Sequence, residues 1–166
     1  MEAHTIKAFN EYFSWISRLK EIDERLWTKP IAEGKWSIRE IIAHITNWDH
    51  HLLSNVLPAV RNERGMEFPD FDTYNRLATD YAQSGITKAQ LIEKAIATRK
   101  QLVRELREMP IKNLNKPLTS NGVTHCPVTG TPYSLLYIIK EFTDHDNHHK
   151  KQIHHFLEIH TVKNNM

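Results

Sequence analysis

Residues 36–45, Trp36-Ser37-Ile38-Arg39-Glu40-Ile41-Ile42-Ala43-His44-Ile45, contain a complete helix start. The Ser37 hydroxyl can accept a hydrogen bond from the amide of Glu40, and the Glu40 side chain can reach back, which makes a capping box. Trp36 and Ile41 flank the box at the spacing of a hydrophobic staple. Apolar side chains then recur at steps of three and four to about Val60: Ile38, Ile41, Ile45, Trp48, Leu52 and Val56. The segment predicts an amphipathic helix from residue 38 to about residue 60.

Two more segments, one on each side of this helix, carry the same periodicity. Apolar residues spaced by three and four from Ile6 to Leu19 predict a first helix, which must end before Lys29-Pro30 because the residue before proline resists helical geometry. A second capping box, Thr87-x-x-Gln90, begins a third helix that Pro110 ends.

A fourth helix is expected to open at Thr131, with Pro132 as its first helical residue, and to stop near Glu158. The connections before the third and fourth helices are long. Residues 62–86 include one short helix around Asp72–Tyr81, and residues 110–130 contain three prolines and should be irregular. Four amphipathic helices with long second and third connections predict an all-α four-helix bundle.

Composition narrows the function classes. The 166 residues suit one domain spanning 1–166, and only 5 glycines disfavour turn-rich β folds and glycine-rich phosphate loops. Lys and Arg number 22 against 20 Asp and Glu, with no sustained run of one sign, so we expect neither a nucleic-acid partner nor a membrane surface. A lone cysteine, Cys126, no signal pattern and no long apolar span predict a soluble, cytoplasmic protein.

The unusual feature is histidine, with 11 in the chain and six of them between residues 145 and 160. On a helical wheel at about 100° per residue centred on Phe142, His149 lies about 20° and His145 about 60° from the centre of the apolar stripe. The remaining histidines of this stretch face solvent or lie at the expected fraying end: His148, His154, His155 and His160.

His145 and His149 therefore interrupt an apolar face, four residues apart. Residues at this spacing lie one above the other, so two imidazoles can converge on one metal ion. A buried polar group without a partner costs about 1–3 kcal/mol, and a shared ion would offset that cost. The alternative is a pair of histidines at the edge of the core, each hydrogen-bonded to a neighbour.

The second helix offers two candidates for a third ligand, His44 and His51. At about 1.5 Å per residue, His44 lies at the level of the His145/His149 pair if the second and fourth helices are antiparallel. His51 fits better if they are parallel. Periodicity leaves the direction open.

Two motifs resemble those of the DinB-like superfamily, the damage-inducible and bacillithiol-transferase group. Residues 36–45 resemble its signature in the second helix, and His145-Asp146-Asn147-His148-His149-Lys150-Lys151-Gln152-Ile153 resembles its signature in the fourth. The resemblance implies up-down-down-up topology with antiparallel second and fourth helices. It also implies a divalent ion, nickel or zinc, bound by His44, His145 and His149, in a protein that is often a homodimer.

Three imidazoles leave a coordination position for water or substrate, as catalytic sites do. The resemblance implies a metal-dependent enzyme acting on a small molecule, either a hydrolase or a bacillithiol-type S-transferase using a low-molecular-weight thiol as cosubstrate. The alternative is a non-enzymatic, dimeric metal-binding protein of a stress response. Which reaction is catalysed, if any, stays open.

Other polar residues near these histidines are weaker candidates. Asp49, Asp144 and Asp146 could orient the ligand imidazoles, although acidic residues of a bundle more often lie on its surface. Gln152 could hydrogen-bond near the site or lie at the edge of the core. Trp48 is expected in the core, and Cys126 is expected to be incidental.

Overall fold

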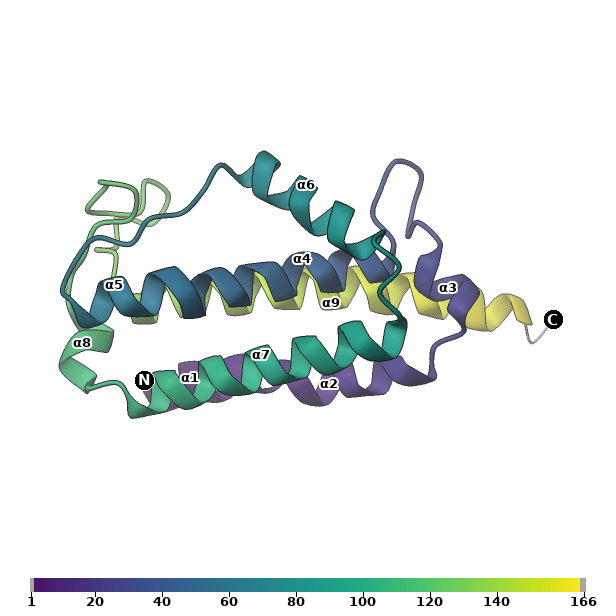
Figure 1. Cartoon of the computed structure of the whole chain (residues 1–166), viewed down its shortest axis with the longest axis horizontal. Helices are drawn as coiled ribbons and strands as arrows, with labels where there is room; N and C mark the ends of the chain where they lie inside the picture. The colour runs from purple at the N-terminus through teal and green to yellow at the C-terminus, as the bar shows by residue number, and fades with distance from the viewer. Residues whose placement is uncertain (1, 165–166) are drawn as a thin grey trace.

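The computed structural model describes residues 2–164, and its main elements are all helices (Figure 1). The four long elements of the bundle are, in chain order, α1 (Glu2–Asn10) continued by α2 (Tyr12–Arg18), α4 (Ile38–His51), α7 (Lys88–Glu108) and α9 (Leu135–Asn164). Figure 1 shows α1–α2 and α9 running one way and α4 and α7 the other. The topology is therefore up-down-down-up, and α4 is antiparallel to α9, as the motif resemblance implied.

The helix that carries His44 begins where its capping box predicts. The Glu40 amide donates to Ser37 Oγ at 3.3 Å, and the Ser37 amide donates to Glu40 Oε2 at 2.7 Å. After His51 the helix continues through a π-helical turn, η2 (Leu52–Val56), into α5 (Leu57–Arg61). Pro58 lies just beyond this turn and has no amide hydrogen to donate, which explains why regular α-helical bonding is interrupted there.

The second connection contains the expected short helix, α6 (Phe71–Ala82), which packs against α4. Figure 1 shows α6 lying across α4 on the side of the bundle away from α2 and α7. The third connection is mostly irregular, as expected, but it begins with one further helical turn, α8 (Ile111–Asn115). Both long connections thus lie near the face of the bundle formed by α4 and α9.

Two expected boundaries of the fourth helix are wrong. The helix begins at Leu135 instead of Thr131, because Ser134 Oγ caps it by accepting from the Tyr137 amide at 3.1 Å. Pro132 instead pairs with His125 in an isolated bridge. The helix also runs past Glu158 to Asn164. The first helical segment is interrupted, with a 3-10 turn, η1 (Leu19–Glu21), and a separate short helix, α3 (Glu24–Thr28), before Lys29-Pro30.

The core consists of two apolar clusters, one toward each end of the bundle. Along α4 with its continuation η2, along α7 and along α9, an interval separates the residues of the two clusters, and Asp49 of α4, Arg99 of α7 and Asp146 of α9 lie in these intervals. A buried polar layer therefore crosses the middle of the bundle. Within residues 2–164, no helix combines the length and apolar character needed to span a membrane.

Candidate metal centre

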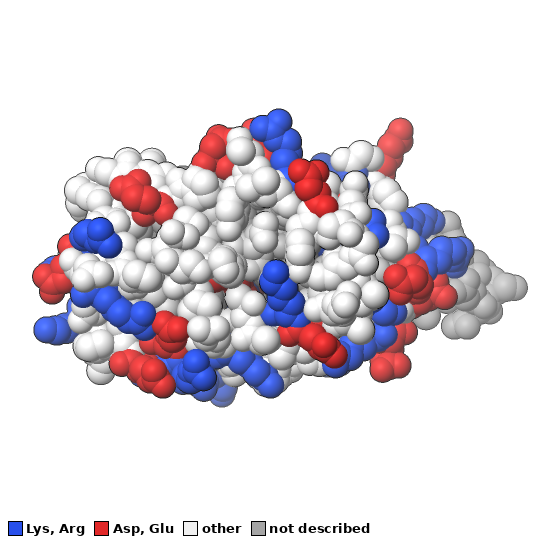
Figure 2. Space-filling model, in the orientation of Figure 1, with Lys and Arg blue, Asp and Glu red and all other residues white. Residues whose placement is uncertain are grey.

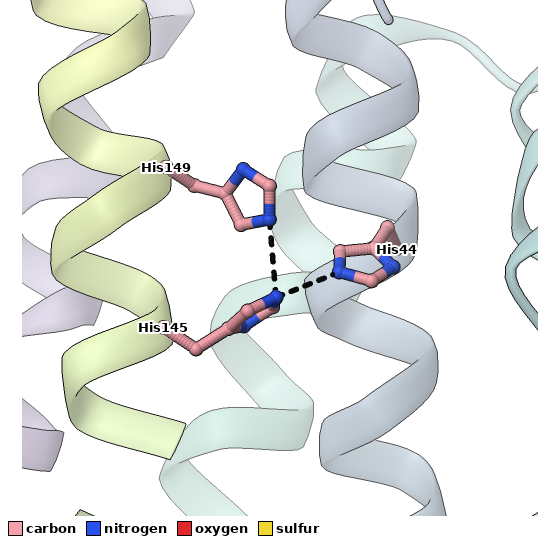
Figure 3. Close-up of side chains that lie close together, drawn as sticks. All are labelled: His44, His145 and His149. Atoms are coloured by element: carbon pink, nitrogen blue, oxygen red, sulfur yellow. Dashed lines mark hydrogen bonds between the residues drawn. The ribbon is translucent and has the colours of Figure 1, made fainter. Parts of the chain in front are cut away.

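Three histidine side chains from two antiparallel helices meet at one point (Figure 3). His145 Nε2 lies 3.0 Å from His44 Nε2 and 3.1 Å from His149 Nε2, and the three nitrogens all lie within 4.8 Å of one another. His44 comes from α4, and His145 and His149 are one turn apart on α9. His51 does not join them, since its Nε2 lies 2.8 Å from the carbonyl oxygen of Glu67.

Side-chain amides fix the tautomers of two of these histidines. His44 Nδ1 lies 2.9 Å from Asn75 Oδ1 of α6, and His149 Nδ1 lies 2.9 Å from Gln152 Oε1. An amide oxygen only accepts hydrogen bonds, so both Nδ1 atoms carry the proton and both Nε2 atoms present a lone pair. These two lone pairs are directed toward His145 (Figure 3).

This donor set fits a divalent cation better than it fits hydrogen bonds alone. A neutral His145 with its proton on Nε2 can donate to only one of the two facing lone pairs, which leaves the other unsatisfied. A cation can accept the Nε2 lone pairs of all three histidines. Zinc–nitrogen bonds of about 2.0–2.1 Å in tetrahedral geometry place ligand nitrogens about 3.3 Å apart, close to the two separations found here.

The electrostatics of the site keep the imidazoles uncharged. Burial, with the two neighbouring imidazoles, lowers the pKa of His44 to about 3. Burial also lowers the pKa of His145 and of His149 to about 4. At neutral pH all three are in the form that binds metal, without first losing a proton. Trp36 covers the group, with its ring centroid 4.8 Å from that of His44.

The acidic residues expected near the site do not contact the histidines. Asp49 and Asp146 are buried and bind Arg99, whereas Asp144 is exposed and pairs with Lys140 at 2.8 Å. Asp49 and Asp146 therefore do not orient the imidazoles, and they do not lie on the bundle surface either, so both expectations for them are wrong. Amides, not carboxylates, contact the imidazoles of His44 and His149.

Arg99 is completely buried and links all four long elements of the bundle. Its Nε and Nη2 donate to the two carboxylate oxygens of Asp49 at 2.7 and 2.9 Å, and its Nη1 donates to Asp146 Oδ2 at 2.8 Å. Nη1 also donates to the carbonyl oxygen of Phe9, and the guanidinium stacks on the rings of Phe9 and Tyr12. Because Asp146 follows His145 and Asp49 lies on the helix of His44, this network fixes α9 and α4 relative to α7.

Among the described residues, the other histidines of the fourth helix do not converge with these three nitrogens, although the ring centroid of His148 lies 5.5 Å from that of His149. His148, His154 and His155 are exposed, as the helical wheel predicts. His160 lies within the helix, not in a frayed end, and its Nδ1 donates to the carbonyl oxygen of Phe156 at 2.8 Å. Cys126 is buried in the third connection, and within the described residues it does not belong to the group of candidate metal-binding side chains formed by the three histidines.

A pocket of about 360 Å³ opens beside His44 and His145. It lies between α4, α9, the beginning of α6 and the third connection. Its other lining residues are Trp48, Phe68, Phe71, Asn75, Ser120, Tyr133, Ile138, Glu141 and Phe142. Charges of both signs are interspersed around the face of the molecule drawn in Figure 2, without a broad patch of one sign.

Comparison with known proteins agrees with the two motifs. The family model of the DinB superfamily matches residues 14–153. The chain belongs to the DinB superfamily. A comparison with curated protein sequences found no match.

A solved structure shares the fold of this DinB superfamily member. YfiT from Bacillus subtilis, described as a probable metal-dependent hydrolase with an unusual four-helix bundle topology, matches with a TM-score of 0.71. The match covers 96% of this chain and 87% of that chain at 13% sequence identity. At this identity the likeness shows the fold alone.

Sequence reasoning missed two residues of the site in this DinB superfamily member. Arg99 occupies a position of the apolar stripe of α7, three residues before Leu102 and four after Ala95, and a charged residue there is a usable signal. Asn75 had no such signal, because nothing in residues 62–86 indicates which side chain of the short helix faces His44.

Proposed function

We propose that His44, His145 and His149 bind one divalent metal ion, and that the protein is a metal-dependent enzyme, most simply a hydrolase. The observation that supports this most strongly is the convergence of three Nε2 atoms, two of which are held as acceptors by the amides of Asn75 and Gln152. Structural metal sites generally have four protein ligands, whereas catalytic sites have three and keep a position for water or substrate.

The ion would act as a Lewis acid and lower the pKa of water, or of a thiol, at its free position. The chain's own residues would hold the ion and position the substrate. Neutral imidazoles supply the ligands, and the pocket bordered by His44 and His145 supplies the approach for a small-molecule substrate. His149 does not line the pocket, so a substrate would meet the site from the side of the other two histidines.

Three imidazole nitrogens suit borderline ions, and we propose zinc or nickel. The DinB superfamily membership and the fold shared with YfiT, a probable metal-dependent hydrolase, support hydrolysis as the reaction. A thiol S-transferase of the bacillithiol type would use the same donor set with a low-molecular-weight thiol in place of water. We further propose that the whole chain is one such domain, acting as a homodimer in the cytoplasm.

An activity screen on zinc- and nickel-loaded protein tests the enzymatic part of the proposal. One arm offers esters and amides, and the other offers an electrophile with bacillithiol or glutathione. We expect turnover in the first arm that is lost in His149→Ala and kept in His154→Ala, whose exposed imidazole lies outside the group. Turnover only in the second arm would assign thiol transfer. Silence in both arms with metal bound would contradict an enzymatic role and favour a metal-binding stress-response protein.

A further inference from the structure

Aromatic side chains form much of the lining of the pocket beside the histidines. Five of its lining residues are aromatic: Trp48, Phe68, Phe71, Tyr133 and Phe142. Its volume of about 360 Å³ lies toward the lower end of the range of about 300–1,000 Å³ typical of small-molecule sites. The space therefore suits a compact ligand with a flat apolar part, since aromatic faces pack well against another ring.

The wall formed by Trp48 is rigid. The Trp48 ring is buried and lies 4.5 Å from the ring of Tyr74, 5.4 Å from that of Phe71 and 6.1 Å from that of Phe142, between centroids. Its Nε1 donates to Asn75 Oδ1 at 3.2 Å, the oxygen that also accepts from His44 Nδ1. One amide thus fixes both the indole wall and a histidine of the proposed metal site, so the distance between them is set by the fold.

The mouth of the pocket exposes an aromatic ring. Phe71, the first residue of α6, is 63% exposed although its ring meets that of Trp48 edge-on. Because Phe71 also lines the pocket, a ligand in the pocket would cover part of its exposed ring and remove that apolar surface from water. Among the described lining residues Glu141 carries the one formal charge, and its carboxylate would repel an anionic group.

We propose that this aromatic pocket binds an uncharged aromatic ring of the substrate and so places the reacting group at His44 and His145. This inference rests on the proposed function, because it assigns the substrate class of the same site. It makes Phe71 and Trp48 specificity-determining residues, and Glu141 a residue that excludes substrates carrying a negative charge on the ring.

Two hydroxamates that differ only in the group beyond the metal-binding end provide the test. Acetohydroxamate and benzohydroxamate are titrated calorimetrically into the zinc-loaded full-length protein. We expect benzohydroxamate to bind at least about tenfold more tightly, because its ring leaves water for an apolar pocket. A ring carrying a para-carboxylate should lose most of this advantage beside Glu141.

Two variants on α6 test the role of the Phe71 ring, with Leu77→Ala as the control for folding and metal affinity. Phe71→Ala should reduce the preference for benzohydroxamate to about threefold or less, since part of the ring's cover is removed. Leu77→Ala should leave the preference unchanged. Leu77 is 54% exposed, comparable to Phe71, but does not line the pocket.

The outcomes separate the pocket from the metal. Equal binding of the two hydroxamates to zinc-loaded protein, or a preference that Phe71→Ala leaves intact, would overturn the aromatic pocket and leave the metal site standing. Benzohydroxamate binding with the same affinity in metal-free protein and in His149→Ala would instead support the pocket and contradict the proposed metal function.

Discussion

One oxygen of Asn75 accepts hydrogen bonds from two side chains, His44 Nδ1 and Trp48 Nε1. An outer residue of this kind sets which nitrogen of the histidine is free to bind a metal. Gln152 does the same for His149 from one turn away on α9. At the scale of single residues, the site therefore depends on two amides as much as on three imidazoles.

Replacing either amide should weaken metal binding without removing a ligand. We expect Asn75→Leu and Gln152→Leu each to lower zinc affinity by about 10–100-fold, because the free imidazole can then turn or change tautomer. Competition with a chromophoric chelator measures this. Asn147→Leu is the matched control, since Asn147 is exposed on α9 between His145 and His149. An affinity in Gln152→Leu equal to that of Asn147→Leu would show that the amide plays no such part.

The two amides also show how far residue-level prediction reaches. Gln152 lies three residues after His149, so its proximity follows from helical geometry. Asn75 is 31 residues from His44 in the chain. Its contact depends on how α6 lies across α4, which no local pattern of residues 62–86 specifies.

At the scale of elements, Arg99 explains how two helices that are distant in the sequence hold their histidines in register. Buried ion pairs are weak evidence for added stability, but removing one partner leaves an uncompensated buried charge. Here two carboxylates depend on one guanidinium. Burial raises the pKa of Asp49 and Asp146, and Arg99 acts against this by attracting their charged forms.

Arg99→Met should therefore destabilise the fold by about 3–5 kcal/mol, as measured by urea unfolding of metal-free protein. Arg104→Met on the same helix, where the side chain is exposed, should change stability by less than about 0.5 kcal/mol. Restoring stability by adding Asp49→Asn and Asp146→Asn to Arg99→Met would support the explanation by charge. A loss as small as that of Arg104→Met would refute it.

The element boundaries show where sequence patterns suffice. The capping boxes at Ser37 and Thr87 have both reciprocal hydrogen bonds in the structure, so α4 and α7 begin as predicted. The start of α9 was misplaced because Thr131-Pro132 imitates a helix start, while the backbone of Thr131 instead accepts from the Cys126 amide at 2.9 Å. That hydrogen bond belongs to the fold of the third connection, which local propensity does not determine.

At the scale of the whole molecule, the three converging histidines should make the metal-free protein sensitive to acid. Their pKa values in the fold, about 3 to 4, lie below the ordinary value of 6.5. The unfolded chain therefore binds more protons between these limits, and stability rises with pH there. Above about pH 6.5 the three imidazoles are neutral in the folded and the unfolded chain, and they do not change the free energy of unfolding with pH. As pH falls from 6.5 toward 4, the unfolded chain takes up protons that the folded chain does not, and the free energy of unfolding decreases.

Thermal unfolding of metal-free protein at several pH values between 7 and 4.5 measures this effect. His149→Gln should show a smaller fall in Tm over that range than the unaltered protein, because one depressed group is gone. The titration of Asp49 and Asp146 is common to both proteins and cancels in the comparison. His154→Gln, which removes an exposed imidazole, should behave like the unaltered protein. Identical pH profiles for His149→Gln and the unaltered protein would contradict the assignment.

The whole-molecule arrangement was predictable to a large extent. Four periodic segments and two long connections predict the bundle, and the family motifs imply the antiparallel α4 and α9 that bring His44, instead of His51, to the level of His145 and His149. The pocket was not predictable. Its walls come from residues 68–75, 120–133 and 138–145 together, so it exists only once both long connections have folded against α4 and α9.

Metal content of two triple variants tests the central claim most directly. One variant replaces the converging histidines, His44→Ala, His145→Ala and His149→Ala; the other replaces the exposed histidines of the same stretch, His148→Ala, His154→Ala and His155→Ala. After loading with zinc or nickel and exhaustive dialysis, elemental analysis should find one ion per chain in the unaltered protein and in the second variant, and none in the first. One tightly bound ion surviving in the first variant would contradict the account.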